Sequence, residues 1–323
     1  MDAPSGRKEF LMDRLTGLIY PIWQLPAEPG ERFPETSAKR FADFLSKSGQ
    51  FLWNLLPSVE QDDACGDFYA MEQLLSLPRD DAFRLGFLSV KAHCAALRIK
   101  TICTVNASFL LHAGTDFAVW MTSLGDLFDC VILKGFDQWD VDMAGADPAA
   151  ISKCFRESAK ETGTVFFTDA DFDLLTPASR KFIQDSGILQ QRFLTDGLES
   201  RDATSVQLPH HYVPASMACL RRDGSMPAGK WVYMADPDAV AFAVDYLNLS
   251  EREGYAWGLL RGVLSSVAQV SMVHLVDFYG GQPIDFDRLF SDEAFSFRLR
   301  YMAGLYGRLP ATYHGRKKKK ESR

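Results

Sequence analysis

The fold is decided by the stretch Phe128-Asp129-Cys130-Val131-Ile132-Leu133-Lys134-Gly135-Phe136. Four apolar residues stand in a row at its centre, with a charged residue on either side. A strand with one face in water alternates apolar and polar residues, whereas a continuously apolar run is typical of a parallel strand that is covered on both faces. The stretch Phe51-Leu52-Trp53 has the same character. The sequence therefore predicts an α/β protein with a parallel sheet buried under helices.

Short apolar runs of this kind recur along the chain, and most are separated by segments with helical periodicity. Eight strands are predicted, at residues 17–23, 51–56, 101–105, 130–133, 164–168, 189–194, 216–220 and 270–278. Eight strand–helix units favour a (β/α)8 barrel over an open, doubly wound sheet. In such a barrel, functional residues lie on the loops after the C-terminal ends of the strands.

Helix starts are indicated by a capping residue followed by proline, whose missing N–H costs nothing there. This pattern occurs at Asp147-Pro148, Thr176-Pro177 and Asp236-Pro237. A capping box begins a further helix at Ser250, with Glu253 three residues on. An earlier helix carries Phe41 and Phe44 on one face and ends at Gly49. Strands and helices therefore alternate, as a barrel requires.

The chain has 323 residues, 47% of them apolar and 24% charged, which is typical of a globular protein. Its net charge is −7, although the last eight residues carry six basic side chains and one acidic, so the rest is strongly acidic. That charge argues against a nucleic-acid surface, because phosphate binding depends on Lys and Arg. We expect a single barrel domain over residues 1–315 and a disordered basic tail over residues 316–323.

The six cysteines are scattered, with no Cys-x-x-Cys and no Cys/His pair at zinc spacing, so reduced thiols are expected. Charged residues interrupt the N-terminal segment, and no apolar run is long enough to span a membrane. Phosphate-binding loops, serine-triad motifs and clusters of metal ligands are absent from the sequence. The sequence predicts a cytoplasmic protein without metal or cofactor.

Five segments stand in order along the chain and invite comparison with a known family. They are Arg40-Phe41-Ala42-Asp43-Phe44-Leu45 with Leu52-Trp53-Asn54-Leu55-Leu56-Pro57, then Leu174-Leu175-Thr176-Pro177, then Leu208-Pro209-His210-His211-Tyr212-Val213-Pro214-Ala215-Ser216, then Leu259-Leu260-Arg261-Gly262-Val263-Leu264 leading to Val273-His274-Leu275-Val276-Asp277, and Phe295-Ser296-Phe297-Arg298-Leu299. The third is similar to Leu-Pro-His-Asn-Tyr-Pro-Pro-Asn-Ser of the 4-α-glucanotransferases (amylomaltases). The others resemble that family's landmarks in the family's order. The resemblance implies a trimmed (β/α)8 TIM barrel with reduced loops over its C-terminal face, shortened mostly between residues 104 and 117.

The resemblance also implies a reaction, retaining transglycosylation, with an Asp nucleophile, a Glu acid/base and a second Asp that stabilises the transition state. Retention needs two carboxyl groups about 5–5.5 Å apart. In this chain all three positions are substituted. Lys134 stands at the nucleophile position, Ala170 at the acid/base position, and Gly224 at the position of the stabilising Asp, which the family places after the seventh strand.

Three carboxylates stand one residue away from these positions and are candidates to restore catalysis. They are Asp169 and Asp171, on either side of Ala170, and Asp223, beside Gly224. On a strand, however, a shift of one residue turns the side chain to the opposite face. The other interpretation is that these carboxylates are ordinary solvated loop residues, above all Asp171.

Four further positions are assigned to substrate binding by the resemblance: Tyr69, His210, Asp277 and Arg298. Tyr69 lies in what remains of a sugar-binding loop, and its ring either stacks on a glucose unit or packs beneath the loop. His210 is either a cleft residue or a histidine bonded to backbone. Asp277 and Arg298 either belong to the site or form a structural ion pair.

Two functions follow from the resemblance, and a third remains open. The first is a catalytically inactive relative that binds α-1,4-glucan or maltooligosaccharide, or acts through a protein partner whose identity the sequence does not reveal. The second is a working 4-α-glucanotransferase with displaced carboxylates, which transfers 1,4-α-glucan segments by a retaining mechanism. The third is a structural or assembly partner whose barrel mouth is closed by side chains.

Overall fold

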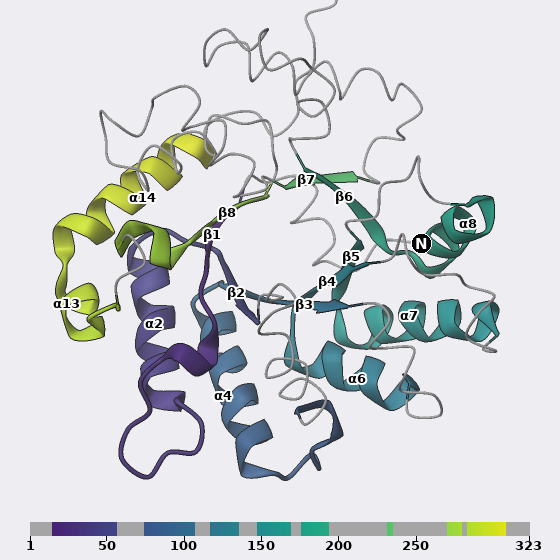
Figure 1. Cartoon of the computed structure of the whole chain (residues 1–323), viewed down its shortest axis with the longest axis horizontal. Helices are drawn as coiled ribbons and strands as arrows, with labels where there is room; N and C mark the ends of the chain where they lie inside the picture. The colour runs from purple at the N-terminus through teal and green to yellow at the C-terminus, as the bar shows by residue number, and fades with distance from the viewer. Residues whose placement is uncertain are drawn as a thin grey trace, which may run out of the picture.

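Eight parallel strands form a closed barrel in sequence order (Figure 1). The structure, a computed structural model, describes residues 15–56, 74–106, 117–135, 147–168, 176–193, 231–234, 270–279 and 283–307. The strands are β1 (Leu15–Ile19), β2 (Leu52–Leu56), β3 (Lys100–Asn106), β4 (Cys130–Lys134), β5 (Val165–Thr168), β6 (Leu189–Phe193), β7 (Trp231–Met234) and β8 (Val270–His274). Pairing of β1 with β8 closes the ring, so the predicted α/β barrel is confirmed.

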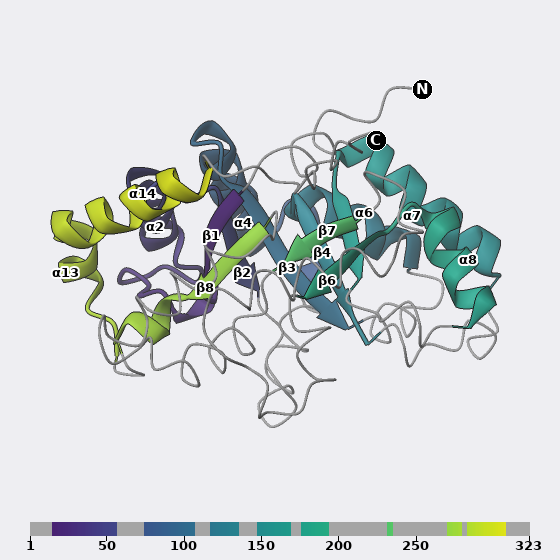
Figure 2. The ribbon, with the colours of Figure 1, turned by 90° about the horizontal axis from the view of Figure 1, so that it is seen from above.

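The described helices lie outside the ring of strands, as Figures 1 and 2 show. The described helices are α2 (Glu35–Lys47), α4 (Ala82–Ala96), α6 (Phe117–Leu127), α7 (Pro148–Thr162), α8 (Pro177–Ser186), α13 (Phe286–Ser291) and α14 (Glu293–Gly307), with 3-10 turns η1 (Ile22–Gln24) and η5 (Leu275–Tyr279). Each of the strands β1 to β5 is followed by one of these helices before the next strand begins. This order is the strand–helix alternation that the sequence predicted.

Local capping chemistry sets the helix ends where it was expected. The side chain of Asp147 accepts a hydrogen bond from the backbone N–H of Ala149 at 2.9 Å, and α7 ends at Gly163 in the left-handed region, with φ +76°. Thr176 caps α8 in the same way. The helix predicted to end at Gly49 is α2; its last residue is Lys47, and Gly49 follows in the left-handed region with φ +70°. The helix starts predicted at residues 236 and 250 lie outside the described residues.

The seventh strand is where the sequence prediction failed. The barrel's seventh strand is β7, whose register pairs Phe193 with Met234 on one side and Met234 with Val270 on the other. The strand predicted at residues 216–220 is therefore not the seventh strand of the barrel, and those residues themselves lie outside the described residues. The cause of the error is that two apolar runs, at residues 216–220 and 231–234, compete for the seventh place, and periodicity does not tell which of them pairs with β6 and β8.

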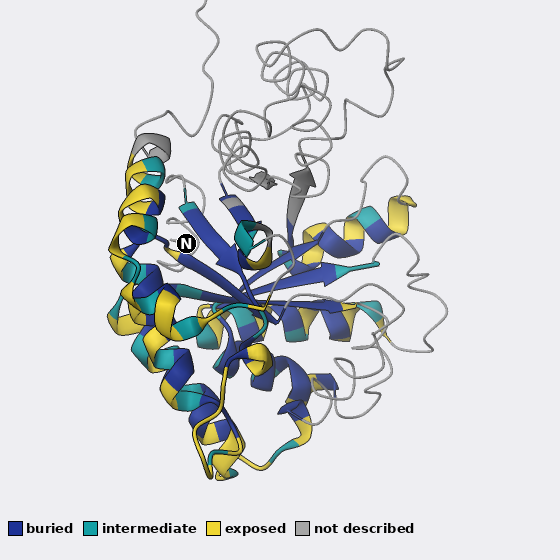
Figure 3. Ribbon diagram, turned by 60° about the vertical axis from the view of Figure 1, so that its left-hand side comes forward, coloured by how far each residue is buried: buried dark blue, intermediate teal, exposed yellow. Residues whose placement is uncertain are grey.

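Two apolar layers stabilise the barrel, one inside the ring of strands and one between strands and helices. The inner layer consists of Ile19, Leu52, Ile102, Cys130, Ile132, Val165, Phe167, Leu189, Val270 and Met272, all buried. Alternate residues of the same strands point outward: Trp53 packs on Phe41 of α2 with ring centroids 4.9 Å apart, and Phe166 packs on Phe155 of α7 at 5.2 Å. The buried strands between partly exposed helices are visible in Figure 3. The continuously apolar strands are thus explained by burial on both faces.

Strands β1 and β2 approach each other very closely. A Cβ atom added at Gly17 would lie 2.4 Å from the carbonyl oxygen and 2.4 Å from the Cβ of Leu52. Next to this contact, the indole N–H of fully buried Trp53 donates to the carbonyl oxygen of Tyr20 at 2.9 Å. This bond joins Trp53, near the start of β2, to the backbone that directly follows β1.

Two predictions of domain organisation are not decided by these elements. The tail at residues 316–323 lies outside the described residues, and a single domain over residues 1–315 stays a prediction. Within the described ranges, no helix combines the length and the apolar character needed to cross a membrane.

Candidate functional site at the barrel mouth

The mouth of the barrel, at the C-terminal ends of the strands, is the place where function is expected in this fold. The residues that face inward at this end follow from the pleat, because side chains two apart on a strand share a face. Asn54 shares its face with Leu52, and Thr104 with Ile102, both of which belong to the inner apolar layer. The interior therefore changes from apolar to polar toward the mouth.

Asn54 and Thr104 form a buried polar pair on neighbouring strands. The two residues are 4% and 9% exposed, and Asn54 Nδ2 donates to Thr104 Oγ1 at 3.4 Å. The other amide atom, Asn54 Oδ1, is buried and has no hydrogen-bond partner within the described structure. An unpaired buried acceptor costs about 1–3 kcal/mol. A hydroxyl or water that reached this oxygen would remove that cost.

The strand ends beyond this pair carry amide, ammonium and imidazole groups. Lys134 ends β4 on the face that holds Cys130 and Ile132, and it is half-buried. In the register of β3 and β4, Lys134 stands beside Asn106, which ends β3. His274 ends β8 beside Ile19 and is also half-buried. These groups donate or accept hydrogen bonds, and none is an acid.

Carboxylates are missing from the barrel strands altogether. The sequences of the eight strands, from β1 to β8, contain neither Asp nor Glu. The carboxylate next to β4, Asp129, lies at the opposite end of that strand, where Oδ2 accepts from the backbone N–H and the hydroxyl of Thr101 at 2.8 and 3.0 Å. Asp129 is therefore part of the structure that holds β3 and β4 together, not of the mouth.

The predicted site residues fall into three groups. Lys134 lies at the mouth, as its alignment to the family's nucleophile requires. Arg298 is exposed on α14 in the outer layer, and Asp277 belongs to η5 directly after β8, its side chain not being described. Outside the described residues lie Tyr69, Asp169, Ala170, Asp171, His210, Asp223 and Gly224. Because most of these residues lie outside the described ranges, their grouping into one site stays a prediction.

The position of β7 corrects one part of the prediction. A residue that follows the seventh strand must lie beyond Met234, whereas Gly224 and Asp223 precede Trp231, the first residue of β7. The carboxylate that follows β7 most closely in the sequence is Asp236, two residues after the strand. Its pairing with Pro237 was interpreted only as a helix start. The sequence signal for Asp236 is an acidic residue shortly after the end of a barrel strand.

The described residues contain no metal site, because no three or more of their His, Cys, Asp or Glu side chains are placed to hold an ion. The four described cysteines are free, and Cys94, Cys103 and Cys130 are buried. Burial raises the pKa of the Cys94 thiol to about 12, so it stays protonated and inert at neutral pH. The described thiols thus give the mouth no nucleophile.

Comparison with known proteins gives one sequence relative and a group of structural ones. No protein-family model matches the sequence. A 4-α-glucanotransferase of Clostridium butyricum is 28% identical over 127 residues, a stretch that covers 39% of this chain and 26% of the relative. The match thus spans about a quarter of the relative's length.

Solved structures that share the fold include amylomaltases and an α-amylase. Amylomaltase from Streptococcus agalactiae, in complex with acarbose, superposes with a TM-score of 0.53 at 11% identity, over 91% of this chain and 99% of that one. Amylomaltase from Corynebacterium glutamicum gives 0.52 at 9% identity, over 95% and 77%. An α-amylase from Lactobacillus plantarum gives 0.51 at 9% identity, over 94% and 81%. At such identities the likeness shows the fold alone. Together with the local sequence match, it supports the family resemblance: the chain is a divergent, amylomaltase-like protein.

Proposed function

We propose that this protein binds α-1,4-glucan at the barrel mouth and does not transfer it. The observation that carries the proposal is Lys134 at the end of β4, where the resemblance places the catalytic nucleophile. A retaining transfer begins when a carboxylate attacks the anomeric carbon, and the covalent intermediate needs a carboxylate leaving group. An ammonium group can do neither, so the first step of the reaction has no agent at that position.

Sugar binding is supported by the groups that the mouth does contain. Glucan hydroxyls both donate and accept hydrogen bonds, which matches the amides of Asn54 and Asn106 and the hydroxyl of Thr104. The unpaired Oδ1 of Asn54 is an acceptor for which a hydroxyl is a suitable donor. Acarbose is bound by the amylomaltase from Streptococcus agalactiae, which shares this barrel. We extend that binding to the present chain as part of the proposal.

The competing function is an active 4-α-glucanotransferase whose carboxylates have moved. It is favoured by two positions: Asp169 follows β5 directly, and Asp236 follows β7 by two residues. Acids directly after barrel strands are where catalytic groups occur in this fold. This function would still need a nucleophile to replace the one that Lys134 displaces.

One pair of measurements separates these functions. The purified protein is incubated with maltotriose, with an active amylomaltase in parallel, and glucose and longer maltooligosaccharides are measured; binding of maltoheptaose is measured by titration calorimetry. We expect saturable binding without products. Binding should weaken in Lys134→Ala or Asn106→Ala and remain unchanged in Lys153→Ala, an exposed lysine of α7.

Each other outcome has a distinct meaning. Products that disappear in Asp169→Asn or Asp236→Asn would establish the active enzyme. Absence of both products and binding would overturn both functions and leave the structural or assembly partner. Sugar bound equally well by all variants would place the binding site elsewhere on the molecule.

We also propose a cellular location and a binding partner for the protein. Free, mostly buried thiols are the usual state in a reducing compartment, which supports the proposed cytoplasmic location. The glucan is the partner that the chemistry of the mouth favours, and no protein partner is proposed.

A further inference from the structure

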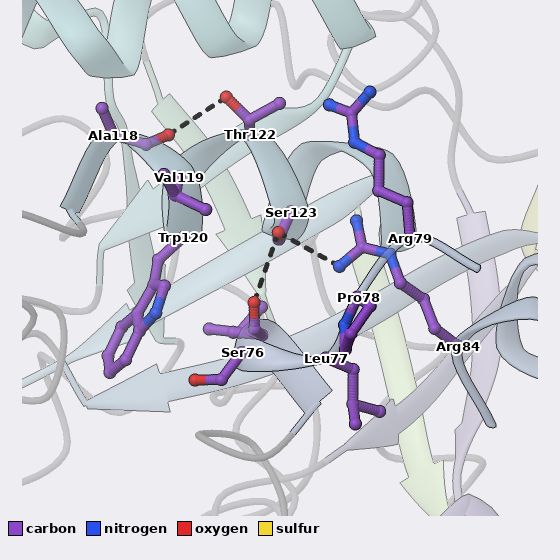
Figure 4. A pocket seen from close by; sticks show the side chains of 11 residues that line it. Ser76, Leu77, Pro78, Arg79, Arg84, Ala118, Val119, Trp120, Thr122 and Ser123 are labelled. Carbon is purple, nitrogen blue, oxygen red and sulfur yellow. Dashed lines mark hydrogen bonds between the residues drawn. The ribbon is translucent and has the colours of Figure 1, made fainter. Parts of the chain in front are cut away.

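A cavity lies outside the barrel, between the beginnings of α4 and α6. It has a volume of about 600 Å³ and is lined by Leu75, Ser76, Leu77, Pro78, Arg79, Arg84, Ala118, Val119, Trp120, Thr122 and Ser123 (Figure 4). Helices that follow strands in a parallel barrel begin at the end where those strands finish. The cavity therefore opens on the same end of the molecule as the mouth, but outside the ring of strands.

The inner wall of the cavity carries a buried arginine. The side chain of Arg84 is 3% exposed; Nη1 donates to the hydroxyl of Ser123 at 3.2 Å, as Figure 4 shows, and Nη2 lies 3.5 Å from Oδ2 of Asp126. The third nitrogen, Nε, has no hydrogen-bond partner among the described residues. A buried charge needs a close, fully bonded counter-ion. A carboxylate at 3.5 Å that is itself 36% exposed meets this need only in part.

A second arginine and a helix terminus add positive charge to the same cavity. Arg79 lines it, is exposed, and has no ion pair in the described part of the chain. The first turn of α6 contributes Ala118, Val119 and Trp120, and contains no acidic residue. The first N–H groups of a helix lack partners within the helix and carry about half a positive charge. Asp126 reaches Arg84 from outside the lining, and the lining itself holds two guanidinium groups and no carboxylate, so positive charge is in excess there.

The walls also define what kind of anion fits. Arginine binds phosphate and carboxylate through paired N–H bonds, and a phosphate monoester carries about −1.5 to −2 charges at neutral pH, which matches the excess positive charge better than a carboxylate does. The remaining lining, chiefly Leu77, Val119 and the largely buried Trp120, is apolar and suited to the organic part of a ligand. We propose that this cavity binds a small phosphate monoester between Arg79, Arg84 and the start of α6.

This site is separate from the glucan site, because its residues come from the outer face of the ring and none of them belongs to a barrel strand. The inference therefore does not depend on the proposed function. Binding of a phosphate ester would be found whether or not the protein binds or processes glucan.

The test compares a charged ligand with its neutral counterpart. Wild-type protein is titrated with glucose 6-phosphate, glucose and inorganic phosphate by calorimetry, with the fluorescence of Trp120 as a local signal that Trp120→Phe should abolish. We expect saturable binding of the ester and no comparable binding of glucose. Arg79→Gln should weaken binding by about tenfold or more, the usual effect of losing a charged hydrogen bond. Arg300→Gln, which alters an exposed arginine of α14, should have no effect.

A buried residue needs a milder change. Arg84→Lys keeps the charge but loses the planar guanidinium fork, so it should also weaken binding of the ester. The circular dichroism spectrum of this variant would establish that it is folded. Absence of saturable ester binding by wild type would overturn the proposal, as would equal affinities of Arg79→Gln and Arg300→Gln. If inorganic phosphate bound as tightly as the ester, the apolar wall would take no part in binding, and the proposal of a phosphate monoester as the ligand would be contradicted.

Discussion

Gly17 provides a direct test of how tightly the barrel is closed. Replacement by alanine would place a Cβ 2.4 Å from the carbonyl oxygen of Leu52, whereas non-bonded heavy atoms prefer separations of at least about 3.5 Å. The strands would have to part by about 1 Å. Leu52 has little freedom to move, because β2 is paired with β1 on one side and with β3 on the other.

Overpacking of this kind costs about 1–3 kcal/mol, and the lower backbone entropy of alanine in the unfolded chain returns only about 0.4–1 kcal/mol. We therefore expect Gly17→Ala to lower the free energy of unfolding by about 1–2 kcal/mol. The matched control is Gly304→Ala in α14, where nothing lies within 4 Å of the added Cβ. There the same change should raise stability by up to about 1 kcal/mol, because alanine is the better helix former. Urea unfolding followed by circular dichroism measures both variants, and a Gly17→Ala protein as stable as wild type would refute the close approach of β1 and β2.

Further predictions concern a hydrogen bond, a helix cap and the buried thiols. Trp53→Phe keeps the ring but leaves the carbonyl oxygen of Tyr20 without its donor, so urea unfolding should give a loss of about 1–3 kcal/mol; an unchanged midpoint would mean that the bond is not formed. Asp147→Ala removes the cap of α7 and should cost about 1 kcal/mol, while Asp147→Asn should recover most of it. In native protein, alkylation mapped by mass spectrometry should modify half-buried Cys154 well before Cys94, and equal rates would contradict the burial that raises the pKa of Cys94 to about 12. The Cys94 thiol stays protonated in the folded protein, whereas in the unfolded chain it ionises near its ordinary pKa. Its contribution to the free energy of unfolding should therefore be fully present below pH about 9 and be lost as the pH rises toward 12, which unfolding curves at successive pH values would measure.

The barrel was predictable from sequence because its strands have an unusual composition. Cys130-Val131-Ile132-Leu133 is apolar throughout, and both faces are indeed covered, Ile132 in the inner layer and Val131 in the outer one. Helix boundaries were predictable where a specific side chain forms the cap, as at Asp147. The strand at Trp231–Met234 was not predicted, although it is equally short and apolar, because the stretch at residues 216–220 competed for the same place in the order.

The candidate site was predictable only where a residue could be counted along a strand. Lys134 follows the apolar run of β4 without interruption, so its place at the mouth follows from the strand itself. Asn54 was missed, although it is the one polar residue within β2, since an isolated amide in an apolar strand resembles a packing variation. The cavity between α4 and α6 could not be predicted at all. It depends on the approach of Arg84 to Ser123, two residues that no sequence period relates.

The pairing of β1 with β8 has a consequence for how the chain acquires its shape. Leu15 lies beside Val270, so the contact that closes the ring joins strands from opposite ends of the described chain. Contacts between residues so distant in sequence slow folding. During synthesis the first seven strands would wait as an open sheet, with a free edge on β1, until β8 leaves the ribosome. In a circular permutant that begins within a helix–strand connection and has the natural ends joined, β8 would precede β1 and the two strands could pair early. Such a permutant should fold faster than the protein in its natural order.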